Sequence, residues 1–119
     1  MKTSILETAL QVAEQFGQAI AKGDFAGARA LLTKQAKRRH TLSALKQAVT
    51  TMTAYANAPI VRARVMREFT LEDWPDKQAG DIAWVYVALE DKAFAEAARL
   101  ALCKADEGVR IRQIGWGRP

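Results

Sequence analysis

The single histidine of the chain is the first residue to consider for acid–base chemistry. His40 follows three consecutive cations at 37–39. The pKa of an unperturbed imidazole lies near neutrality, so His40 is suited to act as a general base. No orienting carboxylate is recognisable in the neighbouring sequence. The simpler interpretation, which we favour, is that four cationic groups complement the carboxyl end of a helix.

Arg67 is the polar residue that we expect to matter most for binding. It lies in a segment that alternates like a strand and shares the parity of the apolar residues Val61, Ala63, Val65 and Phe69. Its side chain is therefore predicted to face the core, where a guanidinium needs a partner. We expect Arg67 to pair with a carboxylate such as Glu96 or to extend into a cavity. The other strand arginines are expected to be solvated, with an anion-binding platform as the alternative; they are Arg62, Arg64, Arg99, Arg110 and Arg112.

Large aromatic residues occur at even positions of two predicted strands. Trp84, Tyr86 and Trp116 share this parity with Ile82 and Ile114. Such residues on a curved sheet usually belong to the core. If a cavity is open, they become its walls, with the hydroxyl and indole N–H groups as polar anchors.

The cysteine and the acidic residues give no sign of a metal site. One cysteine, Cys103, excludes an intrachain disulfide, and one histidine leaves no Cys/His set for zinc. The acids around Trp74-Pro75 do not have calcium-loop spacing and are predicted to lie in a solvated loop; they are Glu72, Asp73, Asp76 and Asp81. Cys103 is expected to be a small buried apolar group. We therefore expect neither a metal nor a cofactor.

Length and charge restrict the class of protein. The 119 residues suit a single domain spanning 1–119. The net charge of +5 lies wholly in residues 1–58, because 59–119 contain ten basic and ten acidic residues. No aromatic–basic pattern of RNA-binding strands accompanies this charge, so nucleic acid is not the expected partner. Apolar runs are far too short for a bilayer, and an amphipathic first segment is not a signal peptide, so we expect a cytoplasmic protein.

The first half of the chain has the periodicity of helices. Residues Ser4 to Glu7 form a capping box ahead of an apolar stripe made by Ile5, Ala9, Val12, Phe16 and Ile20. Lys22-Gly23 is predicted to end this helix, and Asp24 to cap a second one from Phe25 to about Ala36. A third helix is predicted from Thr41, with Leu42, Leu45, Val49 and Met52 on one face.

From Pro59 the apolar period changes to two. Strands are predicted at 61–69, 82–89 and 109–116, with a polar loop over 71–81 and a turn at 90–92. For 93–104 the alanine content favours a helix, whereas the position between two strands favours a strand, which we prefer. Three helices followed by about four antiparallel strands make an α+β fold, with the helices on one face of a curved sheet.

The joint between the first two helices resembles that of a known superfamily. Residues 19–28 (AIAKGDFAGA) are similar to the helix-Gly-Asp-aromatic-helix joint of nuclear transport factor 2-like proteins, which have a cystatin-like α+β fold. Residues 100–103 and 106–117 are similar to the last hairpin of that fold. As architecture the resemblance covers essentially the whole chain, and it implies a conical apolar cavity between helices and sheet. Because this scaffold hosts isomerases, dehydratases, cyclases, dimerisation modules and immunity proteins, it implies no particular activity.

The ketosteroid isomerases of this superfamily can be compared with the chain residue by residue. Their phenolic tyrosine aligns with Phe16, and their oxyanion-hole acid aligns with Leu100. Their general-base aspartate falls near His40. Since Phe16 and Leu100 supply neither a hydroxyl nor a carboxyl group, the resemblance implies that this chain does not carry that chemistry.

The favoured function is noncatalytic binding of a small apolar or carboxylate-bearing molecule in the cavity. Its predicted lining is Phe16, Ile20, Met52, Tyr55, Arg67, Trp84 and Tyr86. The first alternative is a protein-interaction or immunity-type module that uses the sheet face. The second is an isomerase or dehydratase built on His40 with Arg67. A homodimer through the sheet is also expected, because segment 82–89 is apolar on both faces.

Overall fold

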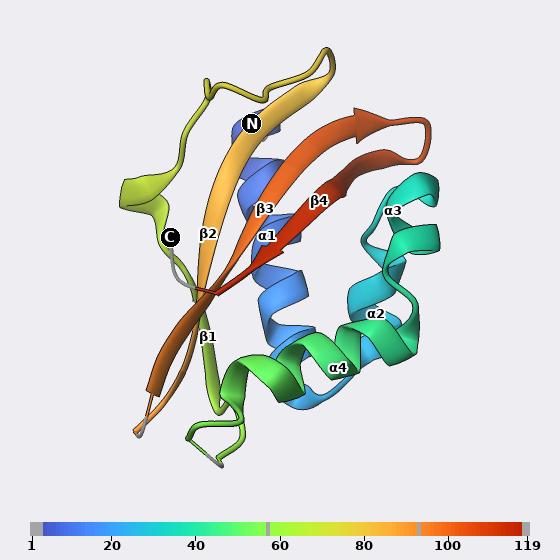
Figure 1. The fold of residues 1–119 in the computed structure, drawn as a ribbon. Coiled ribbons are helices and arrows are strands. Elements are labelled where there is room, and N and C mark those ends of the chain that lie inside the picture. The colour runs from blue at the N-terminus through green and yellow to red at the C-terminus, as the bar shows by residue number, and fades with distance from the viewer. Residues whose placement is uncertain (1–3, 57, 93, 118–119) are drawn as a thin grey trace.

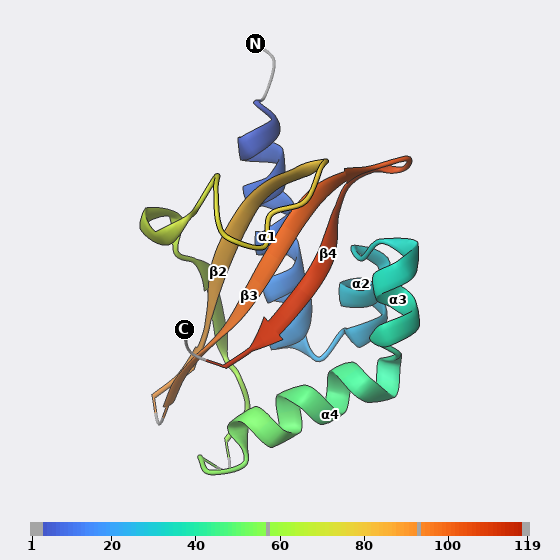
Figure 2. The ribbon, with the colours of Figure 1, turned by 45° about the horizontal axis from the view of Figure 1, so that its top comes forward.

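The computed structural model describes residues 4–56, 58–92 and 94–117. Its helices are α1 (Ile5–Lys22), α2 (Phe25–Ala30), α3 (Lys34–Arg39) and α4 (Leu42–Thr53). Its strands are β1 (Arg62–Val65), β2 (Asp81–Asp91), β3 (Phe94–Ala105) and β4 (Gly108–Trp116), and a short 3-10 helix, η1 (Arg67–Phe69), follows β1. Figure 1 shows α1 lying across one face of the curved sheet, and Figure 2 shows α4 crossing beyond one end of it.

The first helix forms as its sequence predicts. The Ser4 side chain accepts a hydrogen bond from the Glu7 N–H at 3.1 Å, and Gly23 ends the helix with a left-handed φ of 75°. The buried face carries Ala9, Val12, Phe16 and Ile20 of the predicted stripe, whereas Ile5, in the first turn, is exposed. α1 is therefore amphipathic and packs its apolar side on the sheet.

The second predicted helix is in fact two helices. α2 ends at Ala30 because the next residues pair with β4: the N–H of Ile111 donates to Leu31 O, and the N–H of Thr33 donates to Ile111 O, both at 2.9 Å. Thr33 then caps α3, whose Ala36 N–H donates to the threonine hydroxyl. A long-range backbone pairing thus interrupts a continuous helical pattern.

The third predicted helix is α4, with Thr41 as its N-cap. Leu45 is fully buried, and Val49 and Met52 are partly buried against the core. Leu42 was predicted to share this face, but its side chain is exposed. Leu42 is the first residue of the helix and lies beyond the edge of the core, whereas the later turns of the helix cover the core.

The strands form one antiparallel sheet in the order β1-β2-β3-β4. The alanine-rich segment is a strand, as preferred, and pairs with both neighbours over Phe94–Ala105; residue 93, where the predicted strand begins, lies outside the described residues. The strand predicted over 61–69 is wrong in its second half, since β1 ends at Val65 and η1 follows. β2 runs through the acidic residues predicted as a turn and ends at Asp91.

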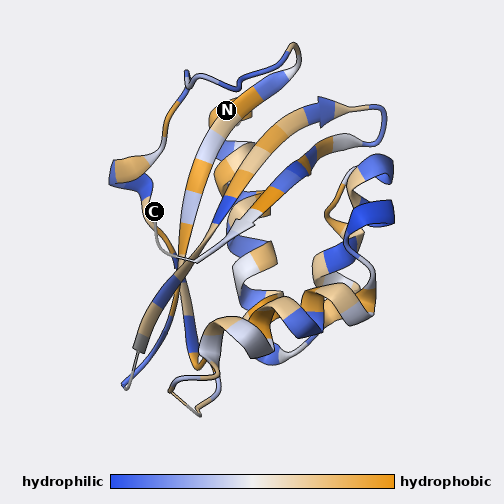
Figure 3. Cartoon of the chain, in the orientation of Figure 1, coloured by the Kyte–Doolittle hydropathy of each residue, from blue (hydrophilic) through white to orange (hydrophobic). Residues whose placement is uncertain are grey.

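The fold class is α+β, with four helices preceding a curved four-stranded antiparallel sheet. The core lies between α1 and the sheet and contains fully buried Phe16, Leu32, Leu45, Val85, Val87, Leu89, Leu100, Leu102 and Ile111. Figure 3 shows hydropathy alternating along β2, whereas α3 is mainly hydrophilic. None of the helices in the described ranges has the length and hydropathy to cross a membrane.

Candidate ligand-binding site

The two faces of β2 have different surroundings. Val85, Val87 and Leu89 face the helices and are fully buried; we call this the inner face. Strand alternation directs Trp84 and Tyr86 to the opposite, outer face, and neither residue belongs to the buried core. Because β2 is apolar on both faces, its sequence did not indicate which parity faces inward.

A groove lies on the outer face of the sheet, between η1 and strands β2 and β3. We call it the outer groove. Its volume is about 670 Å³, and it is lined by Arg64, Met66, Glu68, Phe69, Leu71, Tyr86, Ala88, Glu90, Ala95, Glu96 and Ala97. The floor of the groove consists of small alanine side chains, and larger side chains from the segment after β1 form its wall.

Backbone pairing holds that wall against the sheet. The Met66 N–H donates to Tyr86 O at 2.9 Å, which extends the β1–β2 pairing by one residue. Leu71 and Trp84 exchange two backbone hydrogen bonds, of 2.9 and 2.8 Å. Between these two attachments, the Phe69 ring packs edge-to-face on the Tyr86 ring with centroids 6.5 Å apart.

The next part of the same segment reinforces this attachment. The rings of Trp74 and Trp84 lie 5.9 Å apart, and the Lys77 ammonium lies 5.8 Å from the centre of the Trp74 ring. Lys77 Nζ also donates to Glu72 O at 2.7 Å. The loop over 71–80 is therefore anchored to the outer face by packed aromatic rings.

The polar end of the outer groove contains a small ion-pair cluster. Glu90 Oε1 lies 3.4 Å from Arg64 Nε, and Glu90 Oε2 lies 3.5 Å from Arg62 Nη2. Both guanidinium groups are mostly exposed, whereas the Glu90 side chain is 17% exposed. Glu68 adds a second carboxylate to the lining, against one guanidinium. Glu96 also borders the groove, but its carboxylate accepts the Tyr55 hydroxyl on the inner side of the sheet.

A second hollow lies on the helical side of the sheet, and we call it the Tyr55–Glu96 pocket. Its volume is about 630 Å³, and it is lined by Ala48, Thr51, Met52, Tyr55, Glu96, Trp116 and Gly117. The Tyr55 hydroxyl donates to Glu96 Oε2 at 3.0 Å. α4 and the end of β4 thus meet at a buried carboxylate of β3.

The predicted lining residues do not come together in one cavity. Phe16 and Ile20 are buried in the core, and Leu100 beside them is also fully buried. Met52 and Tyr55 line the Tyr55–Glu96 pocket, while Tyr86 lines the outer groove. Trp84 lies on the outer face beside Tyr86, with ring centroids 6.4 Å apart. Trp116 lies on the opposite, inner face of the sheet, although its position has the same parity, and it packs on Phe16.

The prediction that Arg67 faces the core is wrong. The chain leaves the sheet before this residue, so strand parity does not apply to it, and its side chain is mostly exposed. Its guanidinium pairs with Glu7 at the start of α1 and not with Glu96. Arg67 is absent from the lining of both hollows.

His40 lies at the carboxyl end of α3, as expected from the interpretation that it complements a helix end. It is the C-cap residue, and its backbone carbonyl accepts a hydrogen bond from Arg29 Nε at 3.1 Å. Burial first, and then the charge of Arg39, lower the pKa of His40 below its ordinary value. His40 lines neither the outer groove nor the Tyr55–Glu96 pocket.

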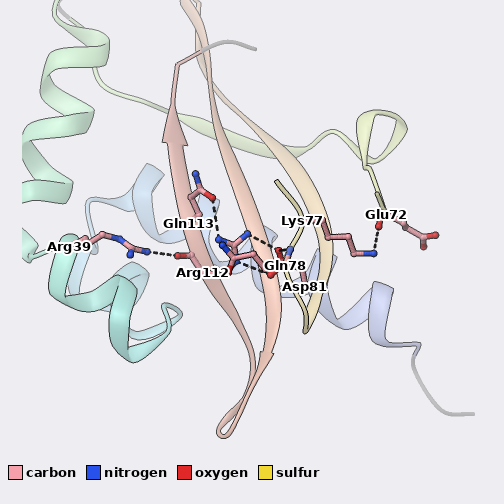
Figure 4. A network of polar contacts seen from close by, with 7 residues as sticks. All are labelled: Arg39, Glu72, Lys77, Gln78, Asp81, Arg112 and Gln113. Atoms are coloured by element: carbon pink, nitrogen blue, oxygen red, sulfur yellow. Dashed lines mark hydrogen bonds and ion pairs between the residues drawn. The ribbon is translucent and has the colours of Figure 1, made fainter. Parts of the chain in front are cut away.

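A buried ion pair between β2 and β4 is the feature that sequence reasoning missed. Asp81 was predicted to lie in a solvated loop, but its side chain is fully buried. Its carboxylate accepts two hydrogen bonds from Arg112: Nε donates to Oδ1 at 2.8 Å, and Nη2 donates to Oδ2 at 2.7 Å. This hydrogen bonding raises the pKa of Arg112. Figure 4 shows the pair with the neighbouring bonds from Gln78 N–H to Asp81 and from Arg39 to Arg112 O.

The environment of the one cysteine is unsuited to thiolate chemistry. Burial, and after it the charge of Asp81, raise the pKa of the Cys103 thiol. Within the described residues, no group of three or more histidine, cysteine or acidic side chains is placed to hold a metal ion.

No family model matches this chain, and no curated protein or solved structure matches it either.

Proposed function

We propose that this protein is a nuclear transport factor 2-like domain that binds a small, mainly apolar molecule in the outer groove. The order of elements supports the fold assignment, because helices precede a curved antiparallel sheet and cover one of its faces. The observation that carries the function is the groove itself: about 670 Å³, walled by Phe69 and Tyr86 and floored by alanines. Ligand pockets typically measure about 300–1,000 Å³ and are mostly apolar.

We place the binding site on the outer face because large side chains occupy the interior. Phe16, Val87 and Leu100 are fully buried between α1 and the sheet. Close packing of this kind leaves few voids larger than a water molecule. The outer groove, in contrast, is open to solvent and has an aromatic wall.

The charges at the polar end favour a neutral ligand over a carboxylate-bearing one. Glu68 and Glu90 contribute two carboxylates to the lining, and Arg64 is already within 3.4 Å of Glu90. A ligand carboxylate would therefore meet like charges and a guanidinium that already has a partner. We expect 1-octanol to bind more tightly than octanoate.

Nuclear magnetic resonance titration of the full chain with these two probes tests the proposal. We expect 1-octanol to shift the amide signals of Tyr86, Ala88 and Ala97 saturably. Ala95→Phe fills the groove from an exposed position and should weaken binding at least about tenfold. Ala44→Phe places the same ring on an exposed part of α4 and should leave binding unchanged. No saturable shifts, or equal weakening by both variants, would contradict the proposal.

The second candidate function is association through the same face, with a second copy as the partner. Phe69 and Leu71 are 52% and 42% exposed, which is unusual for large apolar side chains next to an apolar groove. Sedimentation velocity over a hundredfold concentration range tests this. A dimer that Phe69→Glu dissociates supports self-association, whereas a monomer throughout excludes it and leaves the groove free for a ligand.

A further inference from the structure

One face of the short helix α3 carries three cations. Lys34, Lys37 and Arg38 are three and four residues apart, so they share a face of the helix. Ala36 points the other way and is buried in the core. Lys34 and Arg38 are exposed, and Lys37 is partly exposed. We call the three cationic side chains the α3 basic face.

The protein supplies no acid to balance these charges. Residues 25–67 contain neither aspartate nor glutamate. Among the described residues, no ion pair involves the α3 basic face; the arginines that do pair with acids are Arg62, Arg64, Arg67 and Arg112. Like charges at this spacing destabilise a helix, and Lys34 in the first turn opposes the helix dipole. Folding therefore gains little from this arrangement, which calls for a role beyond stability.

Other groups fix α3 on the molecule. Arg29 donates from Nε to His40 O at 3.1 Å and from Nη2 to Lys37 O at 2.9 Å, so a half-buried cation already serves the carboxyl end of the helix. Arg39 Nη2 donates to Arg112 O at 2.9 Å and joins α3 to β4 (Figure 4). The α3 basic face is thus held in a fixed position and takes no part in these attachments through its side chains.

The composition of α3 restricts the kind of anionic partner. Ala36, the one apolar residue of the helix, is buried, so α3 has no apolar side chain to insert into a bilayer. Residues 26–54 contain no aromatic side chain on which the bases of a single strand could stack. A double-stranded nucleic acid, in contrast, presents phosphates on its surface. The six residues of α3 span about 9 Å, and a duplex carries about five phosphate charges over that length.

We infer that the α3 basic face binds the phosphate backbone of double-stranded nucleic acid, whatever its base sequence. Nucleic acid was not the expected partner, because the strands lack an aromatic–basic pattern; α3 offers a contact of a different kind, made with phosphates alone. Figures 1 and 2 show α3 on the opposite side of the molecule from the segment after β1 that walls the outer groove. Binding at α3 therefore does not depend on ligand binding in the groove.

Fluorescence anisotropy of a short labelled DNA duplex, titrated with the full chain, tests the inference. Three phosphate contacts predict a slope of about −2.7 for log affinity against log salt concentration, which is a loss of about fortyfold between about 50 and 200 mM salt. The matching single strand should bind more weakly. No saturable binding of the duplex, equal or tighter binding of the single strand, or binding only to vesicles that contain phosphatidylserine would overturn the inference.

Substitutions on α3 locate the contact. The triple variant Lys34→Gln, Lys37→Gln, Arg38→Gln should weaken duplex binding at least about tenfold and reduce the magnitude of the salt slope by about 2–3. Arg38→Gln alone should reduce it by about 1. Glutamine is a good helix former, and thermal unfolding checks that the variants remain folded. Unchanged affinity and salt slope in the triple variant would contradict the site.

A control variant with the same loss of charge separates this site from attraction by the net charge of the protein. It replaces three cations that are exposed on other parts of the surface, through Lys22→Gln, Arg67→Gln and Lys92→Gln. We expect it to retain most of the affinity for the duplex. Equal weakening in the two triple variants would mean that the overall charge of +5 attracts the duplex, and it would overturn the inference.

Discussion

Gly17 of α1 lies so close to Val87 of β2 that no side chain fits between them. A Cβ at position 17 would lie 2.7 Å from Val87 Cγ1 and 3.1 Å from the Cβ of Ala63. The helix backbone therefore rests directly on the inner face of the sheet. This contact explains why the interior is closely packed at this level.

Gly17→Ala is expected to destabilise the protein, although alanine favours a helix by about 1 kcal/mol over glycine. Overpacking of this kind typically costs about 1–3 kcal/mol, so the clash with Val87 should dominate. Urea unfolding measures the change. In a Val87→Ala background the same substitution should cost less, and a stabilised Gly17→Ala single variant would refute the close contact.

Asp81→Asn is expected to lower the free energy of unfolding by about 3 kcal/mol, because it leaves Arg112 without its buried anionic partner. The Asp81 side chain is fully buried and Arg112 is 19% exposed, so solvent replaces little of the interaction. Glu68→Gln, at an exposed residue, is the control and should change stability by less than about 0.5 kcal/mol. Similar unfolding midpoints for the two variants would show that the ion pair contributes little.

His40 should make stability rise with pH on the acid side of neutrality. Its pKa in the folded state lies below the ordinary 6.5, so the unfolded chain binds the proton more readily. The contribution to stability is therefore complete above about pH 6.5 and is lost as the pH falls through the lowered pKa of the folded state. The single imidazole signal gives that pKa directly, and His40→Asn should flatten the pH dependence of unfolding in this window. A folded-state pKa above 6.5 would reverse the sign and contradict the prediction.

Arg67→Met should change stability by less than about 1 kcal/mol, because the exposed ion pair with Glu7 is screened by solvent. It should also leave the binding of 1-octanol unchanged, since Arg67 does not line the outer groove. Thermal unfolding and the 1-octanol titration provide the measurements. A loss of the 1-octanol response would restore this arginine as a site residue.

Local sequence predicted the elements better than it predicted their contacts. Capping by Ser4, termination at Gly23 and the alternation of 94–105 all depend on neighbouring residues, and these features were predicted correctly. The break between α2 and α3 was not, because Leu31 and Thr33 pair with Ile111. No periodicity within the helical segment indicates such a partner.

The candidate sites show the same limit. Both faces of β2 are apolar, so its sequence did not show that Tyr86 faces outward and Val87 inward. The ion pair between Asp81 and Arg112 joins residues 31 positions apart. Glu96, in contrast, could be singled out from the sequence, because it is the one charged residue among the apolar residues of its parity in the strand.

Intermolecular nuclear Overhauser effects between 1-octanol and the labelled protein test the central claim most directly. The account predicts contacts from the alkyl chain to the Tyr86 ring and the Ala97 methyl group, on the outer face. Contacts to Phe16 or Val87 instead would place the ligand between helices and sheet and contradict the account.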